Sequence, residues 1–89
     1  MSESVQIVNH PTNPHRFRVR CGRQFVNVDL TPEDLDDNSL RALSALDSMI
    51  DQYEREGRDL ELAHVRTLRE CVAEIIRGAQ DRESRDEAL

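Results

Sequence analysis

The sequence has 89 residues, enough for one small domain and too few for two, and its core must rest on aliphatic side chains because aromatic residues make up only 3% of it. The net charge of −6 argues against non-specific binding of nucleic acid, which needs a basic surface to replace counterions. No apolar run approaches the roughly 20 residues of a membrane span, and the first residues lack a secretion signal, so we expect a cytoplasmic protein.

The first third of the chain predicts β-structure. Residues 5–8 are expected to form a short edge strand, and two prolines make residues 9–15 a loop. Residues 16–21 alternate strictly between apolar side chains and arginines, as in a strand that is buried on one face. Residues 22–23 supply a turn, and residues 24–30 alternate again, so the two runs predict an antiparallel hairpin. The side chains expected on its buried face are Phe17, Val19, Cys21, Val26, Val28 and Leu30.

A helix start is predicted at Thr31, whose hydroxyl can accept a hydrogen bond from the Asp34 amide. Residues 36–38 are poor helix formers, so we expect a brief first turn, a break and a second start at Asp37 or Asn38. The main helix then runs to Glu56, with apolar residues repeating at three and four. The expected buried stripe consists of Leu40, Leu43, Leu46, Met49, Ile50 and Tyr53, with Ala42 and Ala45 beside it.

A second helix is predicted to follow a tight connection. Gly57 is placed to take the left-handed conformation that closes the first helix, and Asp59 is placed to cap the second, which Gly78 then ends. An alternative makes residues 59–65 a strand, because Leu60 and Leu62 alternate with acidic residues. The apolar stripe of the second helix consists of Leu62, Val65, Leu68, Val72, Ile75 and Ile76.

Together these elements predict an α+β fold. A two-stranded antiparallel β-hairpin, with residues 5–8 as an optional third strand, packs on an antiparallel two-helix hairpin. Residues 1–79 are expected to form this single domain, and residues 80–89 a charged flexible tail.

The charge is unevenly distributed along the chain. Residues 1–30 carry four arginines against two acids, whereas the remainder carries eight arginines against sixteen acids. Guanidinium groups at alternate positions of one strand form a strip that suits carboxylates or phosphates, unless they pair with acids of this domain or of a second copy. The arginines of this strip are Arg16, Arg18, Arg20 and Arg23.

The helical part carries the excess of acids and is expected to dock on a basic protein. The candidate docking residues are Asp47, Asp51, Glu54, Glu61, Glu70 and Glu74.

Nothing in the sequence specifies a chemical reaction. The three histidines and two cysteines have no metal-ligand spacing, and no nucleophile with a positioned base or glycine-rich phosphate loop is recognisable. We therefore expect no enzymatic activity, no metal and no cofactor, with both thiols free and packed as small apolar groups.

One family resemblance covers about half of the chain. The runs FVNVDL (25–30), LRAL (40–43), EG (56–57) and LELAHV (60–65) resemble the strand, helix and strand at the centre of STAS (anti-sigma-factor antagonist) domains. The resemblance implies a regulatory domain switched by serine phosphorylation. The chain departs from the family at the switch itself, because Asn38 stands at the position of the phosphorylated serine.

The leading hypothesis is a non-catalytic interaction module, an acidic regulator or inhibitor of the kind common in phages and mobile elements, which binds a basic, nucleic-acid-handling partner. The alternatives are a homo-oligomeric structural protein, for example a homodimer, that uses the open hairpin edge or the helix pair, a small anionic-ligand binder that uses the arginine strip, and a divergent STAS-like domain.

Overall fold

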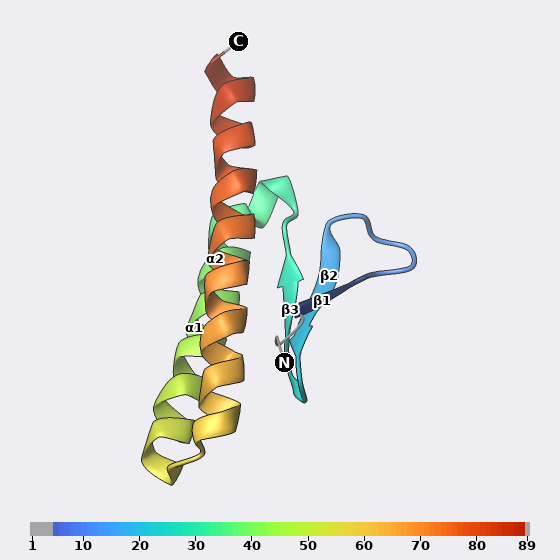
Figure 1. Ribbon diagram of the computed structural model, residues 1–89. Coiled ribbons are helices and arrows are strands. Elements are labelled where there is room, and N and C mark those ends of the chain that lie inside the picture. Colours follow the sequence, from blue (N-terminus) through green and yellow to red (C-terminus); the bar gives the residue numbers. More distant parts are fainter. Residues whose placement is uncertain (1–4, 89) are drawn as a thin grey trace.

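Three β-strands are followed by two long helices in the computed structural model, which describes the backbone of residues 5–88 and the side chains of residues 5–82 (Figure 1). The elements are β1 (Val5–Asn9), β2 (Arg16–Cys21), β3 (Gln24–Asp29), a short 3₁₀ turn (Pro32–Asp34), α1 (Leu35–Glu56) and α2 (Asp59–Ala88). The predicted α+β fold is confirmed, and the N-terminal segment does form the third strand.

The sheet is antiparallel throughout, in the order β1-β2-β3. Val19 at its centre lies opposite Ile7 on β1 and Val26 on β3. Both helices lie on the same side of the sheet, α1 against β3 and α2 against β2 and β3 (Figure 1). The other face of the sheet is left to solvent, as the alternating pattern predicts for an antiparallel sheet covered on one side.

The core fills the space between the sheet and the helix pair. Its fully buried side chains come from β2, β3 and both helices, and they are almost all aliphatic, as the scarcity of aromatic residues requires. The largest of them are Leu46, Leu68, Val19, Val28, Val65, Val72 and Cys21. Each predicted apolar face therefore contributes to one continuous core.

The turn between β2 and β3 is held in close contact with α2. Gly22 has a backbone φ of +61°, a conformation that residues other than glycine rarely adopt. A Cβ atom built on Gly22 would lie 2.6 Å from the imidazole ring of His64. Glycine is therefore favoured at this turn by the backbone conformation, and a side chain there would also have to displace the imidazole ring.

The start of α1 differs from the prediction. The helix begins at Leu35 and runs without a break through residues 36–38. The Thr31 hydroxyl accepts no bond from the Asp34 amide, which donates instead to the Thr31 carbonyl (3.0 Å). Continuity is favoured because Leu35 is buried, and because acidic residues in the first turn interact favourably with the helix dipole.

Burial along α1 also differs from the expected stripe. Leu40 is 66% exposed, and Ala45 is exposed as well, whereas Ser39 is buried. Leu43 remains half-buried and Leu46 is fully buried, as expected. The buried face of the first turns is therefore rotated by one residue toward Leu35, Ser39 and Ala42.

The connection between the helices follows the prediction in part. Gly57 has a φ of +69° and closes α1, with the Arg58 amide donating to the Tyr53 carbonyl (3.0 Å). Asp59 is the first residue of α2 rather than the residue before it, and the Arg58 carbonyl accepts the hydrogen bond from Leu62 (2.9 Å).

The prediction for the C-terminal part was wrong about where α2 ends. Gly78 lies inside the helix, which continues to Ala88, so residues 80–88 are helical rather than an irregular tail. One glycine in a helix costs only about 1 kcal/mol relative to alanine, too little to end it. The strand alternative for residues 59–65 was also wrong, and with it the second central strand that the STAS resemblance requires.

The Asp29 carboxylate stabilises the segment that connects β3 to the helices through hydrogen bonds and an ion pair. It accepts hydrogen bonds from the Thr31 amide (2.9 Å) and hydroxyl, and it forms an ion pair with the Arg16 Nε (2.9 Å). The pKa of Asp29 lies below its ordinary value, and the hydrogen bond from the Thr31 hydroxyl contributes most to this shift. Burial raises the pKa, and Arg16 lowers it further.

This low pKa predicts a pH-dependent contribution to stability. A carboxylate with a lowered folded-state pKa stabilises the fold above its unfolded-state pKa, and the contribution is lost as the pH falls through the folded-state pKa. We expect Asp29→Asn to lower the unfolding free energy by about 1 kcal/mol at neutral pH. Urea unfolding of both proteins at neutral and strongly acidic pH checks this expectation. A difference that persists unchanged in acid would contradict it.

Candidate functional site

The arginine strip lies on the solvent face of the sheet, and its side chains bond mainly to their neighbours. Arg16 is paired with Asp29. The Nε of Arg18 donates to Asn27 (3.1 Å), and its guanidinium lies 4.5 Å from the centroid of the Phe25 ring. The other two, Arg20 and Arg23, are exposed, and the Nε of Arg20 donates to the Gly22 carbonyl (3.0 Å).

The predicted docking acids of the helices divide into two groups. Three of them are ion-paired with arginines. Asp47 with Arg69 (2.6 Å) and Glu54 with Arg66 (3.0 Å) join α1 to α2, whereas Asp51 with Arg55 lies within α1. The other three, Glu61, Glu70 and Glu74, form none of the ion pairs found among residues 5–82. The seam between the helices is therefore largely charge-neutral.

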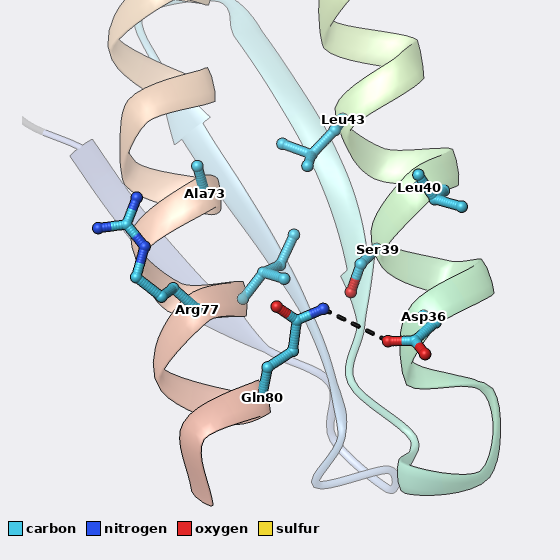
Figure 2. A pocket seen from close by; sticks show the side chains of 8 residues that line it. Asp36, Ser39, Leu40, Leu43, Ala73, Arg77 and Gln80 are labelled. Carbon is cyan, nitrogen blue, oxygen red and sulfur yellow. Dashed lines mark hydrogen bonds between the residues drawn. The ribbon is translucent and has the colours of Figure 1, made fainter. Parts of the chain in front are cut away.

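A groove of about 380 Å³ lies between the first half of α1 and the second half of α2 (Figure 2). The two helices flank it, and the strands lie behind it in this view. It is lined by Asp36, Ser39, Leu40, Leu43, Ala73, Ile76, Arg77 and Gln80. Its walls are apolar in the middle and polar at one end, and Leu40 leaves most of its side chain in water.

A buried hydroxyl without a partner lies in the wall of this groove. Ser39 is only 4% exposed, and its Oγ makes no hydrogen bond in the structure. Figure 2 shows the hydroxyl directed into the space between the helices, toward Gln80. A buried hydroxyl without a hydrogen bond costs about 1–3 kcal/mol, so a polar group that reached Ser39 would gain from bonding to it.

Acidic residues lie near the polar end of the groove. Gln80 reaches from α2 to the Asp36 carboxylate through one long hydrogen bond (3.4 Å), the dashed line in Figure 2. Four exposed acids lie at or just before the start of α1, only Asp36 of them in the groove lining, and none belongs to an ion pair found among residues 5–82: Glu33, Asp34, Asp36 and Asp37. The opposite wall carries one cation, Arg77. The lining itself therefore carries one negative and one positive charge, and the excess of acids lies beside it at the start of α1.

Among residues 5–82 no group of three histidine, cysteine or carboxylate side chains could hold a metal ion. The two cysteines are thiols and form no disulfide with each other, Cys21 lying in the core and Cys71 half-buried on α2. Burial, with a smaller effect of Glu74, raises the pKa of the Cys71 thiol, which keeps it in the less reactive protonated form. No helix within residues 5–88 has the length and apolar character needed to cross a membrane.

The groove residues were mostly missed by the sequence analysis. Leu40, Leu43 and Ile76 were expected in the core, whereas Ser39, Ala73, Arg77 and Gln80 were not considered as site residues. The available signal was Ser39, a polar residue three positions before Ala42 and seven before Leu46 on the buried face. No protein-family model matches the sequence, and neither a curated protein nor a solved structure is significantly similar to the chain.

Proposed function

We propose that this protein is a non-catalytic binding module, an acidic regulator or inhibitor that holds a basic amphipathic helix of a partner protein in the groove between α1 and α2. The observation that carries the proposal is the pairing of an exposed leucine, Leu40, with the buried, unpartnered hydroxyl of Ser39 in one groove. A partner that covers the groove would bury the apolar surface of Leu40 and would offer the Ser39 hydroxyl a hydrogen bond.

The apolar middle of the groove supports an amphipathic helix as the occupant. Such a helix presents apolar side chains at three- and four-residue spacing, and one or two of them would cover Leu40 and Leu43. A polar group of the partner at this depth would complete the hydrogen bonding of Ser39. The Gln80–Asp36 hydrogen bond is long and exposed, so it would open at little cost.

The charge around the groove supports a basic occupant. Asp36 lies in the lining at the polar end, and it would attract a lysine or arginine side chain on the polar face of the partner helix, with the other acids at the start of α1 adding to the negative charge nearby. Arg77 on the other wall would favour a single acidic residue at the matching position. The acids Asp47, Asp51 and Glu54 contribute less to this attraction, because arginines already neutralise them.

Binding of a designed peptide tests the proposal. The probe is a fluorescent helical peptide with leucine at three- and four-residue spacing and lysine at its other positions. We expect Leu40→Asp to weaken binding by about tenfold or more, since it removes apolar contact area from the groove. Ser39→Ala should weaken binding of a peptide with a serine facing the groove while leaving the protein at least as stable as before. Fluorescence anisotropy measures the affinities.

The matched control is Leu60→Asp, which adds the same charge at another exposed leucine (63%) on the first turn of α2, away from the groove. Its affinity should equal or slightly exceed that of the wild type. Affinity should also fall as salt is added, because the acids at the start of α1 are exposed and readily screened. Equal weakening by Leu40→Asp and Leu60→Asp, or binding that is insensitive to salt, would contradict the proposal.

A further inference from the structure

The outer edge of β1 is an unpaired strand edge. No other strand among residues 5–88 pairs with it, and the helices pack on β2 and β3 instead. The strand is uncharged (VQIVN), and Ile7 and Val8 are 51% and 57% exposed. Natural proteins usually protect such edges with charges, prolines or bulges, because a flat apolar edge invites pairing with another strand.

The hydrogen bonds of the sheet identify which backbone groups face this edge. The His10 amide donates to the Arg16 carbonyl (3.0 Å), so these two residues form a bonded pair next to the end of β1. Because bonded and non-bonded pairs alternate along an antiparallel ladder, Gln6 and Val8 bond to β2. The amides and carbonyls of Val5, Ile7 and Asn9 therefore point outward, and this set is symmetric about Ile7.

We infer that two copies of this chain pair through β1 in antiparallel fashion, with a two-fold axis at Ile7, to form a six-stranded sheet. In this register Ile7 exchanges both hydrogen bonds with its counterpart, and Val5 pairs with Asn9 at either end. Every outward-facing backbone group of β1 then has a partner. The Ile7 side chains lie on the helix-bearing side of the sheet, as Val19 does, and they cover one another.

A second copy fits this edge because the two paired strands would place no like charges against each other. The strand itself carries no charge, so no like charges face each other across the axis. The arginine strips of the two copies lie on β2, and three strand spacings of about 4.8 Å separate them by roughly 14 Å. That distance exceeds the screening length of about 8 Å at physiological salt. The inference does not rest on the proposed function, because β1 contributes no residue to the groove between α1 and α2.

Charge substitution at Ile7 tests the inference. The full chain should elute at twice its mass of 10.3 kDa in size-exclusion chromatography with light scattering. Ile7→Lys and Ile7→Glu should each be monomeric, because the axis places two like charges together, and an equimolar mixture of the two should form a heterodimer. Leu60→Lys is the matched control at an exposed leucine away from the edge, and it should remain dimeric. Far-ultraviolet circular dichroism confirms that each variant is folded.

Three results would overturn the inference. The first is a wild-type chain that is monomeric at tens of micromolar, which would mean that the edge stays unpaired. The second is a dimer that survives Ile7→Lys, which would place the interface elsewhere. The third is a mixture of the two charge variants that remains monomeric, because a two-fold axis at Ile7 requires the opposite charges to meet.

Discussion

Replacing Leu46 with alanine is expected to lower the unfolding free energy by about 2–5 kcal/mol, the range for removing a leucine from a closely packed core. Leu46 is fully buried on α1, where the sheet and α2 enclose it. Small domains have a total stability of about 5–15 kcal/mol, so this loss is a large fraction of it. Urea unfolding followed by circular dichroism measures the difference.

Leu40→Ala is the matched control, since it makes the same change on the same helix at a residue that is 66% exposed. We expect it to change the unfolding free energy by less than about 0.5 kcal/mol. Similar losses for both variants would show that Leu40 belongs to the core of the protein in solution, and the groove would then not exist as described.

Replacing Gly22 with alanine is expected to destabilise the fold by about 2–4 kcal/mol, through two separate effects. Alanine is strained by about 1–2 kcal/mol at a positive φ, and its Cβ would displace the His64 ring, which lies 2.6 Å from that position. Denaturant unfolding of the purified variant measures the sum of the two.

Gly57→Ala separates these effects. Gly57 has nearly the same φ, +69°, but a Cβ added there would meet no atom within 4 Å, so only the backbone strain applies. Combining Gly22→Ala with His64→Ala should remove the steric part and bring the cost of the Gly22 change down to that of Gly57→Ala. Equal costs for the two single glycine variants would mean that the ring does not pack on the turn.

The β-strands and the helical hairpin could be predicted because local patterns determine them. Alternation around Val19 and Val26 places one face of the hairpin in the core, and Gly57 ends α1 where a left-handed residue is needed. The errors occurred where a weak local signal competes with packing. Gly78 and residues 36–38 disfavour a helix only slightly, and burial of neighbours such as Ile76 and Leu35 outweighs that preference.

The groove could not be predicted because it depends on how far the two helices are rotated against each other. A stripe of leucines specifies which residues are apolar, but a rotation of one residue decides whether Leu40 or Ser39 is buried. An ion pair between α1 and α2, such as Asp47 with Arg69, is easier to predict from the sequence. Asp47 and Arg69 lie equally far from Arg58 in the turn, so an antiparallel helix pair brings them to the same level.

An amide NMR titration with the basic amphipathic peptide is the measurement that tests the proposed function most directly, because it reports where the peptide lies. We expect the largest shift changes along the groove, at Ser39, Leu40, Ala73 and Arg77. Changes concentrated on the arginine strip of the sheet, or no changes at peptide concentrations that saturate the anisotropy signal, would contradict the proposed function.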